Sequence, residues 1–405
     1  MSDTSSNTVR EFEQLLDPVT STHFFAEYFE KAPLVLNRSN THFYNNIINL
    51  TDLDTYFYQS VNTESLQVMD ESKLVHNEKW TTTSTASDAS VTVVDQHKLW
   101  AQLRMGRSMR ISGAQNYIAS LERFCSSVAN DLQFRVNANI YITPPSATAL
   151  KAHYDTHDVL VLQISGEKQW RFYDSPVVRP GPQQPFDQLD YEVKQPSNEF
   201  MLSPGDLAYI PRGLVHQAES LDTTSVHVSL GLHYNVVHNL FDELASRFQN
   251  NEAFRQALPH GYSSDRERNE FAVEIGRLIQ QALPSFTIDE AIDQSERARQ
   301  PSVPAQSFSE TLASPLLCNG ALLQRNFSAK HNLIREKSRI RLLVNEDTID
   351  IPILFEPLLD TLLGDMPFSL SDWQVLASEK TKQDLAKRLI EAGFLTFFHE
   401  PDYAG

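Results

Sequence analysis

Two histidines and one aspartate are the residues of this 405-residue chain whose types and spacing could do chemistry. His153 and Asp155 stand two apart, and residues i and i+2 of an extended strand project from the same face. His216 comes later, after a glycine turn, a short apolar run and Pro211. Two imidazoles and one carboxylate on one side of a metal ion leave other coordination positions open. This is the facial triad that holds non-haem Fe(II) in oxygenases.

The elements that must position these residues lie between about 136 and 235. Short apolar runs alternate there with turn residues, which indicates an antiparallel β domain of the sandwich or barrel type. Two tight turns, one at Gly166 and one at Ser203–Asp206, predict hairpins between the strands that they join. The expected strands are 137–142, 159–164, 169–173, 200–202, 207–210 and 225–232.

Regions outside this β domain have a different periodicity. The N-terminal part, 1–135, reads as mixed α/β, with a helical pattern from about 98 to 135. Amphipathic helical stripes follow the β domain within 236–300, and they need a partner surface to cover them. A polar linker rich in Pro and Ser spans 301–315. The remainder, 316–405, combines helices with a small sheet, as in a winged helix.

Composition limits the possible functions. The chain has 34 Lys and Arg against 52 Asp and Glu, a net charge of −18, and direct nucleic-acid binding is therefore not expected. The same charge suits a basic protein or peptide as partner. No apolar run approaches the roughly 18 residues that a membrane span needs. Two cysteines, Cys125 and Cys318, cannot form a disulfide framework, and we therefore expect a cytoplasmic protein.

Four segments together resemble the JmjC family of Fe(II)- and 2-oxoglutarate-dependent oxygenases within the cupin superfamily. The resemblance is nearest to the ribosomal oxygenases, which hydroxylate ribosomal proteins. The segments that carry it are Asn139–Pro145, His153–Asp155, Gln163–Arg171 and Ile210–His216. The resemblance implies a double-stranded β-helix core within an α+β chain, with the catalytic domain at 1–235 and its barrel at about 136–235. It further implies a helical dimerisation domain at 236–300, a winged-helix-like domain at 316–405 and a homodimer.

The resemblance also assigns roles to single residues. It makes His153, Asp155 and His216 the iron ligands and places Lys168 against the distal carboxylate of 2-oxoglutarate. A buried carboxylate needs such a cation because desolvation would otherwise be costly. The other candidates are polar strand residues expected to hold 2-oxoglutarate or to line the pocket: Asn139, Tyr141, His227 and Ser229. His157 follows the triad closely but is taken as a wall residue. Trp170 is expected in the core.

The activity implied is hydroxylation of an amino-acid side chain in a protein or peptide, with Fe(II), 2-oxoglutarate and O₂. An Arg or His of a ribosomal protein is the leading substrate, and a biosynthetic precursor peptide is the next. Demethylation of lysine is one alternative. The others are a cupin that uses another metal without 2-oxoglutarate and a non-catalytic, metal-binding cupin module. Retention of the triad together with Lys168 favours the enzyme.

Overall fold

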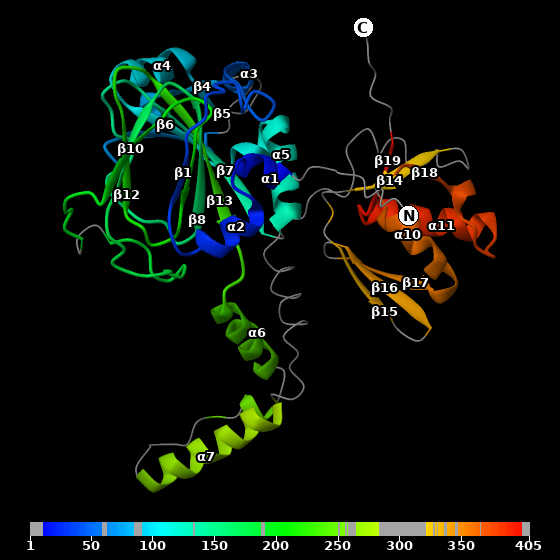
Figure 1. Cartoon of the computed structure of the whole chain (residues 1–405). Coiled ribbons are helices and arrows are strands. Elements are labelled where there is room, and N and C mark those ends of the chain that lie inside the picture. The colour runs from blue at the N-terminus through cyan, green and yellow to red at the C-terminus, as the bar shows by residue number, and fades with distance from the viewer. Residues whose placement is uncertain are drawn as a thin grey trace. The chain divides into compact units, whose positions relative to one another are not determined.

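A computed structural model describes most of the chain and divides it into two units, 1–234 and 235–405 (Figure 1). The N-terminal unit is described at 11–58, 63–84, 91–132, 134–187 and 191–234. The C-terminal unit is described at 235–249, 252–255, 257, 265–282, 321–326, 329, 331–335, 338–344, 347–364 and 366–398. Within these residues, no helix is both long and apolar enough to cross a membrane.

Two antiparallel sheets form the centre of the N-terminal unit and face each other in Figure 1. The small sheet has the order β10-β9-β12, and the large sheet has the order β1-β11-β8-β13-β7-β6-β2-β3. The strands of the small sheet are β9 (Lys168–Phe172), β10 (Asn198–Leu202) and β12 (His216–Ser220). Those of the large sheet are β1 (Leu34–Leu36), β2 (Leu66–Asp70), β3 (Lys73–Leu74), β6 (Ser108–Ile111), β7 (Arg135–Thr143), β8 (Asp158–Ser165), β11 (Leu207–Ile210) and β13 (Ser225–His233). A separate pair joins β4 (Thr81–Ser84) to β5 (Val91–Val94).

Side-chain alternation along β8 explains why this strand is apolar on both faces. Val159 and Val161 pack with Trp170 of the small sheet, whereas Leu160 and Leu162 belong to the core on the opposite face. Because successive side chains of a strand point to opposite faces, a continuous Val-Leu-Val-Leu run is what a strand buried on both sides requires.

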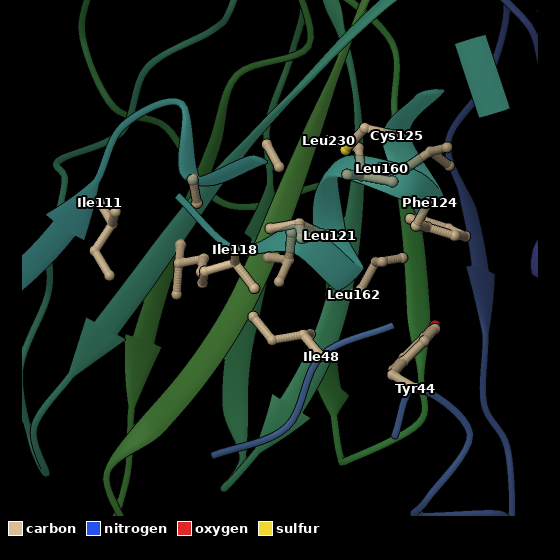
Figure 2. Packing of buried hydrophobic residues seen from close by; sticks show 14 of the residues in the cluster. Tyr44, Ile48, Ile111, Ile118, Leu121, Phe124, Cys125, Leu160, Leu162 and Leu230 are labelled. Carbon is tan, nitrogen blue, oxygen red and sulfur yellow. The ribbon is translucent and has the colours of Figure 1, made fainter. Parts of the chain in front are cut away.

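Helices pack at one end of the large sheet and along its outer face. Those at the end are α3 (Leu50–Tyr58) and α4 (Gln96–Arg104), and those along the outer face are α1 (Glu11–Leu16), α2 (Ser21–Glu27) and α5 (Ala119–Leu132). Leu121, Phe124 and Cys125 of α5 pack in one cluster with Leu160 of β8 and Leu230 of β13 (Figure 2). Full burial of each such side chain contributes roughly 1.5–3 kcal/mol to the free energy of folding. The helical layer therefore stabilises the strands of the large sheet.

Both hairpin predictions are wrong, although the strands themselves are found. Strand β8 pairs with β11 and β13, whereas β9 pairs with β10 and β12. Each tight turn therefore carries the chain from one sheet to the other. Gly166 and Gly205 occupy these turns with φ of +64° and +93°, where a Cβ would lie 2.1 Å from Thr224 O and 2.2 Å from Asn40 O respectively. A turn sequence fixes a reversal of direction but not which strand the next segment pairs with.

The helical pattern predicted over 98–135 is interrupted. Helices α4 and α5 form its two ends, but β6 lies between them and pairs with β2 and β7. Strand pairing supplied by the folded sheet overrides the local periodicity in this segment.

The C-terminal unit begins with the amphipathic helices α6 (Val237–Gln249) and α7 (Asp265–Ala282). The predicted linker at 301–315 and Cys318 lie outside the described residues. Beyond them are two three-stranded antiparallel sheets, β18-β14-β19 and β15-β16-β17. Their strands are β14 (Leu322–Arg325), β15 (His331–Arg335), β16 (Arg339–Val344), β17 (Asp347–Pro352), β18 (Phe368–Ser369) and β19 (Leu395–Phe397). They share a core around Trp373 with α10 (Leu359–Leu363) and α11 (Glu379–Glu391). The α+β content matches the sequence-based expectation, and the winged-helix assignment stays a prediction.

Candidate metal centre and active-site cavity

The structure brings His153, Asp155 and His216 together. One ligand atom from each lies within 4.8 Å of the other two. Nε2 of His216 is 3.6 Å from Oδ2 of Asp155, and the two imidazole centroids are 4.6 Å apart. This is the close, three-donor cluster that one metal ion requires.

Backbone carbonyls orient both imidazoles. Nδ1 of His153 lies 2.8 Å from the carbonyl oxygen of Lys151, and Nδ1 of His216 lies 3.0 Å from that of Leu214. A carbonyl oxygen only accepts hydrogen bonds, so each Nδ1 carries the proton. Each Nε2 is thereby left with a free lone pair for a metal, which is the usual arrangement behind metal-binding histidines.

The electrostatics of the cluster favour the metal-binding protonation states. Burial alone would raise the pKa of Asp155, but the neighbouring His153 and His216 outweigh it and hold that pKa below its usual value. Burial, with the nearby His153, lowers the pKa of His216 to about 4. Near neutral pH, Asp155 is therefore ionised and His216 is neutral, so neither must lose a proton to bind a metal.

The segment that carries the first two ligands is not the regular strand that the i, i+2 argument assumed. Strand β8 begins only at Asp158, and His153 makes an isolated antiparallel bridge with His216. The bridge has backbone hydrogen bonds of 3.1 and 2.8 Å, which bring the two histidines side by side. The N–H of Gly213 donates to the carbonyl of Asp155 over 3.1 Å. Gly213 has φ of +87°, and a Cβ there would lie 2.3 Å from Val177 O, so the turn requires glycine.

A cavity of about 160 Å³ between the two sheets contains the triad. The large sheet contributes side chains from β7, β8 and β13, and the small sheet contributes them from β9 and β12. Every sequence-predicted site residue lines this cavity: Asn139, Tyr141, His153, Asp155, Lys168, His216, His227 and Ser229. The structure thus places the predicted set at one site, while their individual roles stay predictions.

Lys168 is the most unusual of these residues because it is a cation that is only 1% exposed. Its Nζ donates to Oγ1 of Thr143 over 2.8 Å and lies 3.5 Å from Nδ1 of His227. Among the described residues, no carboxylate lies within ion-pair distance of it. Desolvation lowers its pKa to about 7. A buried cation without a counter-ion in a cavity fits an anionic ligand, since pairing would offset the cost of burial.

The polar residues of β7 and β13 form one wall of the cavity. His227 pairs with Tyr141 and Ser229 with Asn139 across the two strands. The rings of Tyr141 and His227 stack at 4.9 Å with an interplanar angle of 5°. Burial, with nearby Lys168, lowers the pKa of His227 well below its usual value, so this imidazole is neutral. A neutral imidazole can accept a hydrogen bond here without repelling Lys168.

Two cavity residues were missed by the sequence-based reasoning. Arg110 of β6 lines the cavity, and its positive charge acts on both Tyr141 and Asp155. Nothing in the sequence indicated that this arginine lies at the site, because it is a single basic residue in a segment predicted to be helical. Trp170 packs in the core as expected but also lines the cavity, 6.1 Å from the ring of His216. His157 lines the wall as predicted and stacks on His233 at 4.5 Å.

The donor set fits Fe(II), and the cavity fits a dicarboxylate. Two imidazoles and one carboxylate are the donors of the facial triad. Lys168 supplies a cation within the same cavity at which a second carboxylate of a ligand can be held. The residues present therefore suit Fe(II) and 2-oxoglutarate together.

Comparison with known proteins confirms the family resemblance. Residues 110–240 match the JmjC domain. This range contains all three triad residues, Lys168 and the strands of both facing sheets that line the cavity. The chain therefore contains a JmjC domain, with the cupin fold and the mixed helix and strand content that the sequence predicted.

The curated relatives include proteins named "Bifunctional lysine-specific demethylase and histidyl-hydroxylase NO66". The one from Drosophila yakuba is 29% identical over 308 residues, which cover 70% of this chain and 44% of that protein. The one from Dictyostelium discoideum is 28% identical over 310 residues, which cover 69% of this chain and 57% of that protein. This chain thus spans about half the length of the curated relatives that it matches.

Solved structures of similar fold include the Escherichia coli ribosomal oxygenase YcfD. It is 16% identical with a TM-score of 0.54, and the match covers 94% of this chain and 98% of that chain. A structure of YcfD in complex with cobalt and 2-oxoglutarate matches with the same TM-score and identity over 94% and 99% of the two chains. At this level of identity, the match establishes the shared fold.

Proposed function

We propose that this protein is an Fe(II)- and 2-oxoglutarate-dependent dioxygenase that hydroxylates an amino-acid side chain of a protein or peptide. The observation that carries the proposal is that one cavity contains the triad and the buried Lys168, which has no carboxylate partner among the described residues. A metal-binding module without catalysis needs the triad alone. It has no use for a cation whose burial is costly.

The residues of the site would bind two different groups, the metal ion and 2-oxoglutarate. His153, Asp155 and His216 would hold Fe(II), and Lys168, positioned by its hydrogen bond to Thr143, would hold the distal carboxylate of 2-oxoglutarate. When bound, iron and 2-oxoglutarate activate O₂, so that one oxygen atom enters the substrate as hydroxyl and the other enters succinate, with release of CO₂. Val159, Val161 and Ile210 form an apolar part of the cavity wall.

The leading substrate is an Arg or His of a ribosomal protein, and a biosynthetic precursor peptide is the second choice. The relatives named as histidyl-hydroxylases and the ribosomal oxygenase fold neighbour support this order. Lysine demethylation is kept as a second candidate because the same relatives are also named as lysine-specific demethylases. We further propose a cytoplasmic homodimer that uses the α6–α7 region as its interface and a winged-helix-like C-terminal domain that makes structural or protein contacts.

The test is succinate formation from 2-oxoglutarate in the presence of Fe(II), ascorbate and air, without substrate and then with ribosomal proteins. The wild type is compared with His153→Ala and with His42→Ala, a matched control at an exposed histidine. Mass spectrometry separates the candidates: hydroxylation adds the mass of one oxygen atom, whereas demethylation removes a methyl group as formaldehyde. If neither Mn(II) nor 2-oxoglutarate binds by calorimetry, the oxygenase proposal is wrong.

A further inference from the structure

A second hollow, of about 320 Å³, lies at the edge of the large sheet. We call it the basic groove because four of its lining residues are cations. They are Lys73, Lys79, Arg107 and Lys151. Two carboxylates, Asp70 and Glu71, also line it, so cations are in excess. This excess is unusual on a chain whose net charge is −18.

The lysines of the groove are available to a partner. Arg107 is paired with Asp70, with its Nε 3.2 Å from Oδ2. Among the described residues, by contrast, no carboxylate lies within ion-pair distance of the amino groups of Lys73, Lys79 and Lys151. All three side chains are exposed, so their charges meet solvent or a bound ligand.

The walls of the groove are held in place. Glu71 and Ser72 form the turn between β2 and β3 with φ of +46° and +71°. Oγ of Ser72 accepts the N–H of Lys151 over 2.6 Å, and the N–H of Ser72 donates to the carbonyl of Ala149 over 3.2 Å. The hairpin is thus tied to the loop that carries Lys151, so a ligand meets a preformed surface.

The same loop connects the groove to the active-site cavity. Ala149 and Leu150 line the cavity, whereas Lys151 lines the groove. The carbonyl of Lys151 also orients the imidazole of His153. Lys151 and His153 are two residues apart, or at most about 7 Å along an extended backbone. A chain segment whose side chain enters the cavity can therefore reach the groove within a few residues.

We infer that the basic groove binds an acidic segment of the polypeptide substrate, with Asp or Glu side chains near the residue that enters the cavity. The inference rests on the proposed function in that it takes the substrate to be a polypeptide. Unpaired lysines attract carboxylates, while the acidic remainder of the surface repels them. The groove would thereby determine which target residues are presented to the iron.

The test is fluorescence anisotropy with a short fluorescein-labelled Glu/Gly peptide at low salt, without iron or 2-oxoglutarate. We expect saturable binding that weakens as salt is raised, and that weakens about tenfold or more in the charge-reversed variant Lys73→Glu/Lys151→Glu. The control variant Lys380→Glu/Lys387→Glu changes the net charge equally at exposed positions of α11 and should bind like the wild type. A thermal unfolding curve verifies that each variant is folded.

Three outcomes would overturn the inference. The first is that the wild type does not bind the peptide. The second is that the charge-reversed variant binds it as tightly as the control variant does. The third is that an oligouridylate occupies the groove in preference to the peptide. Because no cofactor is present in this assay, its failure leaves the oxygenase proposal intact. Conversely, a failed turnover assay with retained peptide binding would reject the oxygenase and not the groove.

Discussion

Replacing Lys168 with methionine tests the reasoning about the cavity most directly. We expect this substitution to raise the stability of the ligand-free protein and to weaken the binding of 2-oxoglutarate. Burial lowers the pKa of Lys168 from 10.5 to about 7. That difference corresponds to roughly 5 kcal/mol against the charged form in the folded state. Methionine has a similar length and no charge, so Lys168→Met removes this cost when no ligand is bound.

The sign of the pH dependence follows from the lowered pKa. Above pH 10.5 lysine is neutral in both the folded and the unfolded states, and its burial carries no charge penalty. As the pH falls, the unfolded chain takes up a proton that the folded protein resists, so the penalty grows until it is complete below about pH 7. The stability advantage of Lys168→Met should therefore be largest near pH 6 and should narrow toward pH 9.

The net gain is smaller than the full charge penalty, since the variant also loses the hydrogen bond to Thr143 and packs imperfectly. We expect a gain of about 2 kcal/mol for the ligand-free protein. In a unit of this size, that raises the melting temperature by about 4–8 °C. The affinity for 2-oxoglutarate should fall about 100-fold, because a buried carboxylate loses its charged partner.

The assay is thermal unfolding across this pH range, with and without 2-oxoglutarate, combined with calorimetric titration of 2-oxoglutarate into the Mn(II)-loaded protein. Lys73→Met is the control because Lys73 is exposed, and it should change neither quantity. The reasoning is refuted if ligand-free Lys168→Met is no more stable than the wild type at any pH. It is equally refuted if the variant binds 2-oxoglutarate as tightly as the wild type does.

Three further predictions concern the metal centre and its supports. Asp155→Ala removes one of three ligands and should weaken Mn(II) binding at least ~100-fold by calorimetry; unchanged affinity would exclude Asp155 as a ligand. Asp158→Ala leaves the buried Tyr209 hydroxyl and the Arg212 N–H without their shared acceptor, which should cost about 2–4 kcal/mol in urea unfolding. A cost below about 0.5 kcal/mol would show that this network does not support the fold. Gly231→Ser places a Cβ 2.5 Å from Asn137 Oδ1 and 3.0 Å from the His157 ring, which should lower stability by about 1–3 kcal/mol. Gly276→Ser, with nothing within 4 Å, is its control, and equal effects of the two variants would contradict the packing argument.

The sequence by itself determined the local features of this protein. The His153–Asp155 pair, the later His216 and the apolar run of β8 could be identified because covalent neighbours and side-chain periodicity fix them. The resemblance carried by these segments then placed Lys168, Asn139 and Tyr141 at the same site. All of them do line one cavity.

Only the tertiary structure decided how the strands pair, what is buried and which distant residues meet. The turns at Gly166 and Gly205 were predicted as hairpins, yet the chain crosses there between two sheets, because pairing partners depend on the whole barrel. From the sequence alone, Lys168 is equally compatible with a solvated lysine in a turn. In the folded protein the surrounding side chains exclude solvent from it. Arg110 lines the cavity, and Arg107 and Lys151 line the same basic groove, only because strand pairing brings distant parts of the chain together. Desolvation and contacts between distant residues arise only when the whole chain is packed, so they cannot be predicted from a short stretch of sequence.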